Sequence, residues 1–73
     1  MANLDKQYLI FMGRKIRSYR EKMGVSQEQF GKIAKFHRTY VGMIERGEKN
    51  MTIGNMHRIA RALNVHVRDL VDF

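Results

Sequence analysis

Residues 25–47, VSQEQFGKIAKFHRTYVGMIERG, carry the most informative pattern in this 73-residue chain. Apolar residues recur there at helical spacing in two short runs, one on each side of the tripeptide KFH at 35–37. Ser26 followed three residues later by Gln29 is typical of a capping box, which starts a helix. Gly47 ends the second run, because glycine readily adopts the conformation that follows a helix. We therefore predict two helices joined by a three-residue turn, at about 27–34 and 38–46.

The apolar residues of the two helices are expected to face each other. Phe30, Ile33 and Ala34 in the first helix would pack against Val41 and Ile44 in the second, with the helices crossing at a wide angle. The second helix is then held outward, and its free face offers Arg38, Thr39, Gly42 and Met43. A helix exposed in this way fits the major groove of B-DNA, which is about 12 Å wide. The pattern predicts a helix-turn-helix over about residues 26–46.

The flanking sequence predicts three more helices, because apolar residues recur there too at spacings of three and four. The first, about 5–22 and ended by Gly24, carries the stripe Leu9, Met12, Ile16, Tyr19 and Met23. The next, about 53–63 after the cap Thr52, carries Ile53, Met56, Ile59, Ala60 and Leu63. The last, about 67–72, is short. The expected fold class is all-α, a compact five-helix bundle forming a single domain over residues 1–73.

The charge of the chain indicates a polyanionic partner. Lys and Arg total 14 against 7 acids, a net charge of +7, and domains this basic commonly bind nucleic acid. Eleven of the 14 bases, but only four acids, lie between residues 6 and 49. Arginine can donate two hydrogen bonds to guanine, and a threonine methyl can pack on the thymine methyl. Arg38 and Thr39 are therefore the leading candidates for contacts with bases.

Other classes of function find no support in the residue types. The chain has no cysteine, and its histidines, His37, His57 and His66, lack carboxylates or thiols at ligand spacing. A nucleophile–base pair and a phosphate-cradling glycine loop are also missing, so we expect no enzyme activity, metal, cofactor or small-molecule ligand. The longest apolar run, 8–12, is far shorter than the roughly 20 residues that span a bilayer. Without a signal-peptide pattern, we expect a cytoplasmic protein that makes no membrane contact.

Three short motifs connect the chain to a known family. They are Ser26-Gln27, Ile44-Glu45-Arg46-Gly47 and Ile59-Ala60 followed by Leu63, and together they resemble the Cro/C1-type (Xre) helix-turn-helix family, with its lambda-repressor-like DNA-binding domain. The resemblance covers about residues 13–72. Within that family, Arg38-Thr39-Tyr40 and the downstream Asn50 and Thr52 are similar to the controller proteins of restriction-modification systems, which are small dimers that bind operators.

The resemblance implies a role for each matching residue. The residues implied to face bases are Arg38, Thr39, Tyr40 and Met43. Those implied or expected to reach phosphates are Ser26, Gln27, His37, Arg46 and Lys49. For Ser26 and Gln27 the physics agrees, because a helix N-terminus presents free N–H groups and a positive dipole to an anion. Arg20 and Glu45 match positions that form a structural salt bridge between the first and third helices.

Three positions depart from the family pattern. Gly31 in the first of the two helices stands where alanine is usual, which lowers the stability of the helix. Lys35 stands at a turn position that is often glycine, and a left-handed backbone there would cost about 1 kcal/mol. The alternative is a turn of slightly different shape. His37 precedes the second helix in place of the usual Ser, Asp or Asn cap, and it would contact a phosphate when it is protonated.

The small footprint of one recognition helix predicts a dimer. One such helix reads only a few base pairs, so a specific site needs two helices related by a two-fold axis, with half-sites about one helical turn apart. The expected interface is the C-terminal region, about 64–73, which is nearly neutral and rich in apolar residues: Val65, Val67, Leu70, Val71 and Phe73. The alternative is that these residues close the core of the monomer.

The sequence therefore predicts a sequence-specific transcriptional regulator that binds a palindromic operator in double-stranded DNA as a homodimer. A restriction-modification controller is one form of this prediction. A phage- or plasmid-type repressor and an antitoxin-like module that binds a protein are the alternatives, because the same fold serves all three.

Overall fold

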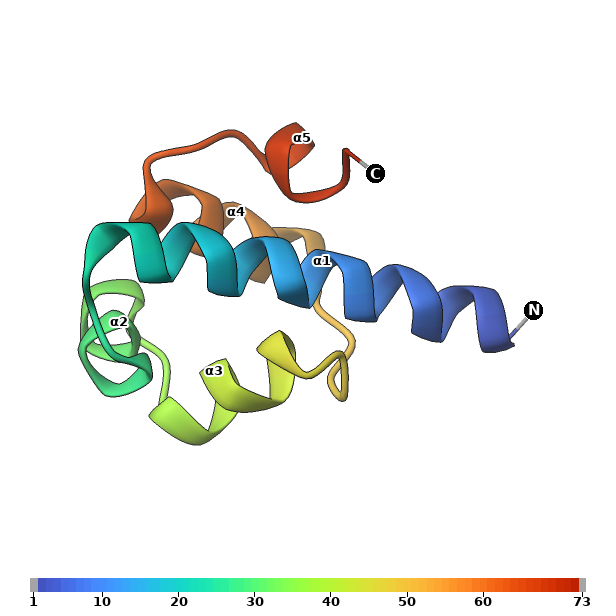
Figure 1. Ribbon diagram of the computed structural model, residues 1–73, viewed down its shortest axis with the longest axis horizontal. Helices are drawn as coiled ribbons and strands as arrows, with labels where there is room; N and C mark the ends of the chain where they lie inside the picture. Colours follow the sequence, from blue (N-terminus) through green and yellow to red (C-terminus); the bar gives the residue numbers. More distant parts are fainter. Residues whose placement is uncertain (1, 73) are drawn as a thin grey trace.

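The computed structural model describes residues 2–72, and these residues form five helices and no strand. They are α1 (Ala2–Met23), α2 (Gln27–Ala34), α3 (Arg38–Glu45), α4 (Ile53–Leu63) and α5 (Val67–Leu70). In the view of Figure 1, α1 runs along the molecule, with α2 and α3 on one side of it and α4 and α5 on the other. The predicted all-α five-helix fold is confirmed.

The helix ends differ from the predictions by a few residues. α1 begins at Ala2, α3 ends at Glu45 with Arg46 as its C-cap, and α5 ends at Leu70. The last turn of a helix frays and is held by few hydrogen bonds, so apolar periodicity does not fix its boundaries. Arg46 consequently lies just outside the recognition helix rather than in its last turn.

One apolar core joins all five helices. Its most deeply buried large side chains are Ile16 from α1, Phe30 from α2, Ile59 from α4 and Leu70 from α5. Val41 and Ile44 bring α3 into the same cluster. Burying a side chain of this size contributes about 1.5–3 kcal/mol relative to leaving it exposed. The inward side of α3 is thereby fixed, and its opposite side faces solvent.

Three residues predicted to be inward lie at the surface. Ile33 in α2 is 51% exposed and Ile53, the first residue of α4, is 73% exposed. Met23, at the end of α1, is also exposed. The prediction is wrong at these three positions, because each residue lies in the first or last turn of its helix, where the apolar stripe extends past the edge of the neighbour that covers it.

The turn between α2 and α3 adopts the left-handed conformation that the sequence analysis considered. Lys35 has φ 64° and ψ 45°, and the amide of Phe36 donates to the carbonyl of Gly31 at 2.8 Å. A Cβ on Gly31 would come within 2.5 Å of the carbonyl oxygen of Phe36. Glycine is therefore required inside α2, since any side chain there would push the turn away from the helix.

The C-terminal end of α3 lies directly against α1. A Cβ on Gly13 in α1 would collide with the carbonyl oxygens of Ile44 and Glu45. Just after α3, Gly47 has φ +73°, and a Cβ there would lie 2.7 Å from a side-chain carbon of Ile10. The two glycines let α1 and the end of α3 approach to backbone contact, which fixes the direction in which α3 leaves the bundle.

Candidate DNA interface

The turn before α3 is clamped by a side chain of α4. Arg58 Nη2 donates to the carbonyls of Ala34 at 3.0 Å and Lys35 at 2.7 Å, and its guanidinium lies 4.0 Å from the ring centroid of Phe36. These bonds satisfy carbonyls at the end of α2, and the ring contact adds a cation–π attraction. Sequence reasoning missed Arg58, because it lies more than 20 residues from the turn and shows only as a base on α4.

Arg38 and Thr39 lie exposed on the outer side of α3. Arg38 Nη1 is 4.0 Å from Glu28 Oε2, and both side chains are largely exposed. A loose surface pair of this kind contributes little to stability, so the guanidinium can turn toward a groove at low cost. Met43 is half-buried on the same side. Gly42 was expected on the free face, but it is buried, because the side chains of Arg46 and Gln27 cover it.

His37 is the N-cap of α3. Its Nδ1 accepts a hydrogen bond from the amide of Thr39 at 3.0 Å. This hydrogen bond uses the lone pair of Nδ1. His37 therefore cannot cap α3 in this way while Nδ1 carries a proton. A phosphate contact through a doubly protonated ring would therefore require α3 to lose its cap, whereas a contact through Nε2 would not.

Tyr40 lies at the edge between α3 and α4. Its ring centroid is 4.8 Å from that of Phe36, and its hydroxyl accepts a hydrogen bond from Asn55 Nδ2 at 3.0 Å. The ring is half-buried, so much of Tyr40 stabilises the fold. The hydroxyl proton is still available to a base or a phosphate at this edge. Asn55 is a second residue that sequence reasoning missed.

The N-terminus of α2 is capped as predicted. Ser26 Oγ accepts from the amide of Gln29 at 3.0 Å, and Gln29 Oε1 accepts from the amide of Ser26 at 2.8 Å. This capping box uses the acceptor side of the Ser26 hydroxyl. The hydroxyl proton remains as a donor for an anion at the helix end.

Arg46 is already paired with a carboxylate. Its Nε lies 2.8 Å from Glu48 Oε2 and its Nη2 lies 3.2 Å from Glu48 Oε1, with both side chains exposed. The hydrogen bonds lower the pKa of Glu48 and raise that of Arg46. The sequence analysis missed Glu48, which partly neutralises one predicted phosphate contact, whereas Lys49 beside it is exposed.

The predicted partners Arg20 and Glu45 form a buried bidentate ion pair. Arg20 is 8% exposed and Glu45 is 7% exposed. Arg20 Nε is 2.6 Å from Glu45 Oε2 and its Nη2 is 3.0 Å from Oε1. The hydrogen bonds to Glu45 raise the pKa of Arg20 above its ordinary value.

Two further hydrogen bonds extend this network. Arg20 Nη1 donates to the carbonyl of Val25 at 2.8 Å, and Gln27 Nε2 donates to Glu45 Oε1 at 3.0 Å. The network therefore links α1, the loop before α2, α2 and α3. It also fixes the direction of the Gln27 side chain, which the sequence assigned to a phosphate.

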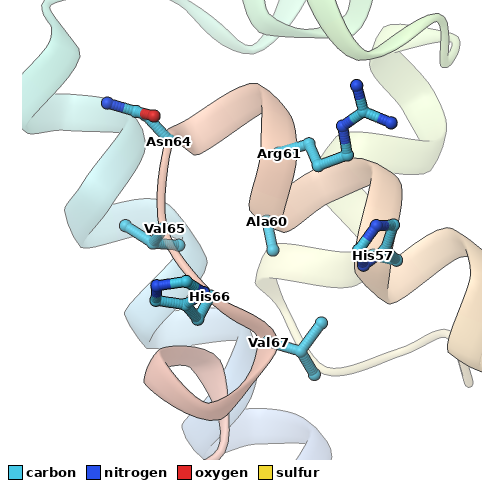
Figure 2. Close-up of a pocket in the computed structure, with 7 residues that line it drawn as sticks. All are labelled: His57, Ala60, Arg61, Asn64, Val65, His66 and Val67. Atoms are coloured by element: carbon cyan, nitrogen blue, oxygen red, sulfur yellow. The ribbon is translucent and has the colours of Figure 1, made fainter.

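The C-terminal region divides between core and surface. Leu70 is 0% exposed, so its assignment to a dimer interface is corrected: it closes the core of the monomer. Val71 is 43% exposed. Val65 and Val67 are half-buried against the core, and Figure 2 shows them beside α4 around a hollow that His57 and Arg61 also line. Phe73 lies outside the described residues.

Metal clusters and membrane-spanning helices are both absent from the described residues. Within residues 2–72, no group of three or more His, Cys, Asp or Glu side chains is arranged to hold a metal ion. In the same part of the chain, no helix is long and apolar enough to cross a membrane.

Comparison with known proteins identifies the family. The sequence profile of a helix-turn-helix family matches residues 16–70, most of the chain. The protein therefore belongs to this family, of the Cro/C1 type, and is a DNA-binding regulator of transcription.

Several relatives belong to one kind of regulator. The chain is 40% identical over 65 residues to control protein C.BamHI of Bacillus amyloliquefaciens, a match that covers 88% of this chain and 80% of the relative. It is 42% identical over 60 residues to control protein C.SmaI of Serratia marcescens, with 82% and 71% covered. The crystal structure of the restriction-modification controller protein C.AhdI from Aeromonas hydrophila matches with a TM-score of 0.84 and 34% identity, over 89% of this chain and 94% of that chain.

The buried ion pair leads to a prediction about stability. Replacing Glu45 by alanine leaves Arg20 buried and unpaired, and we expect a loss of about 3–5 kcal/mol in the free energy of unfolding. Urea denaturation measures this loss, and DNA affinity per folded molecule should fall less. The control is Arg17→Ala, because Arg17 forms an exposed pair with Glu21 on the same helix and should cost no more than about 0.5 kcal/mol. A larger effect of Glu45→Ala on affinity than on stability would contradict a structural role.

Proposed function

We propose that this protein is a restriction-modification controller, which binds an inverted-repeat operator in duplex DNA as a homodimer. The observation that carries the proposal is the exposed outer side of α3, with Arg38 and Thr39 on a helix whose inner side is locked into the core. The similarity to three proteins named as controllers supports the choice among regulators. In this proposal the protein works in the cytoplasm with its DNA and needs no cofactor.

The proposed complex has α3 in the major groove. Arg38 and Thr39 read base edges there, since both lie on the exposed side of the helix. Met43 packs against the floor of the groove, and Tyr40 reaches its edge. The residues proposed for phosphates lie at the two ends of this surface: Ser26, Gln27 and His37 at the helix N-termini, and Arg46 and Lys49 after α3. Phosphate contacts would fix the register of the protein on the DNA, and base contacts would give the specificity.

The proposed organisation has one domain with two working parts. The helix-turn-helix, residues 26–46, contacts DNA, and the C-terminal region, residues 64–73, contacts the second subunit. Val71 is the best candidate for this contact, because it combines an apolar side chain with substantial exposure next to the half-buried Val65 and Val67. A two-fold axis through this region would hold two recognition helices about one turn of DNA apart.

Selection from random duplex DNA at about 150 mM salt tests the proposed function. We expect enrichment of an inverted repeat whose half-sites lie about ten base pairs apart. Retention of DNA without any enriched sequence would contradict operator recognition. It would mean that the positive charge of the protein binds DNA without regard to sequence. A failure to retain DNA would contradict the whole proposal and direct attention to a protein partner.

Substitution of Arg38 tests base readout. We expect Arg38→Ala to weaken binding to the selected operator by about 1–3 kcal/mol and to relax the preference at one position of each half-site. Arg38→Lys is the matched control, because lysine keeps the charge but not the planar pair of donors. Competition binding against random DNA measures both effects. An Arg38→Lys variant with full specificity would mean that Arg38 supplies only charge.

Substitution of Val71 tests the dimer. We expect Val71→Asp to shift the protein from dimer to monomer in sedimentation equilibrium, because a carboxylate would lose its hydration at an apolar interface. Ile33→Asp is the matched control, since Ile33 is similarly exposed but lies in α2, on the other side of α1 from α5 (Figure 1). Helical content should be unchanged in both variants. A wild-type protein that remains monomeric at high micromolar concentration would contradict the proposed assembly.

A further inference from the structure

Gly42 is buried although it lies on the outer side of α3, away from the core. A Cβ built on Gly42 would lie 3.0 Å from Arg46 Nη1 and 3.8 Å from Arg46 Cζ. The same Cβ would lie 3.4 Å from Gln27 Oε1. The Arg46 guanidinium therefore reaches back by one helical turn and covers the glycine, and the amide of Gln27 lies beside it.

The side chains of Gln27 and Arg46, which both lie close to Gly42, are each held by hydrogen bonds to a glutamate. Gln27 Nε2 donates to Glu45 Oε1 at 3.0 Å, so the Gln27 oxygen is directed to the glycine. Arg46 donates through Nε and Nη2 to Glu48, so the remaining nitrogen, Nη1, lies over the glycine. Both side chains are therefore held close to Gly42, and a Cβ at this position would push the Arg46 guanidinium away.

We infer that Gly42 is a positioning residue for DNA binding. The absence of a side chain lets Arg46 lie against α3 beside Gln27, so that groups from α2 and from the end of α3 meet the same stretch of DNA backbone. The inference rests on the proposed function, in which Gln27 and Arg46 both contact phosphates. A methyl group at position 42 would crowd the tip of a flexible arginine rather than backbone, so the guanidinium would move and the fold would stay intact.

The experiment compares Gly42→Ala with Gly54→Ala, a matched control in α4. A Cβ on Gly54 has only Thr52 Oγ1 within reach, at 3.9 Å. Both substitutions replace a helical glycine, and both should raise the melting temperature by roughly 2–8 °C. Fluorescence anisotropy with the selected operator and with random duplexes, titrated from 50 to 200 mM salt, then measures binding. The melting temperature reports the effect on stability and the anisotropy titration reports the effect on DNA binding, so the two effects are measured separately.

We expect only Gly42→Ala to bind DNA more weakly. The affinity for DNA should fall about fivefold. This is less than the roughly tenfold or more in affinity that a charge-assisted hydrogen bond contributes, because the guanidinium is displaced and not removed. It should be similar on operator and random DNA, and the slope of log K against log salt should become shallower by up to about one. A gain in stability with a loss of affinity is the signature of a positioning role.

A double-mutant cycle with Arg46→Ala identifies the side chain through which Gly42 acts. In the Arg46→Ala background, we expect Gly42→Ala to cause no further loss of affinity, because the guanidinium that it displaces is already gone. The inference is overturned if Gly42→Ala binds as tightly as Gly54→Ala, or if its loss persists in the Arg46→Ala background. Wild-type protein that binds no DNA would instead overturn the proposed function, and this inference with it.

Discussion

The ion pair between Arg20 and Glu45 is the constraint on which the arrangement of the recognition helix depends. Both charges are buried, and burial of charge is costly unless the geometry satisfies every donor and acceptor. Here the pair is bidentate, and Val25 and Gln27 complete its hydrogen bonds. Because Glu45 belongs to α3, that helix cannot rotate or slide without leaving a charge unpaired inside the protein. The pair therefore sets one orientation of α3, which apolar packing alone would set less sharply.

The two sides of α3 have separate tasks. Val41, Ile44 and Glu45 face inward and hold the helix, whereas Arg38 and Thr39 face outward and take no part in the core. A helix allows this separation because side chains three and four residues apart share a face. In the proposed complex, substitutions on the outer side would therefore change the DNA sequence that is read without changing the fold. One architecture can in this way serve regulators with different operators.

Several groups proposed to meet DNA are already engaged within the free protein. Arg46 is paired with Glu48, and His37 caps α3 through Nδ1. Exposed ion pairs contribute little, so a phosphate can replace the Glu48 carboxylate on Arg46 at small cost in stability. Until then, the Glu48 carboxylate partly neutralises the charge of Arg46.

Local sequence patterns were enough to predict the five helices and most of their caps, because caps and turns depend on residues three or four apart, such as Ser26 and Gln29. The sequence also shows that the bases concentrate between residues 6 and 49, and its family resemblance indicated the pairing of Arg20 with Glu45. The packing of the helices, by contrast, was needed to show that Arg58 clamps the turn, that Leu70 is inside, and that Arg46 covers Gly42. Periodicity shows which face of a helix is apolar, but the extent to which a face is covered depends on helices distant in sequence. Contacts of that kind leave no local pattern to read.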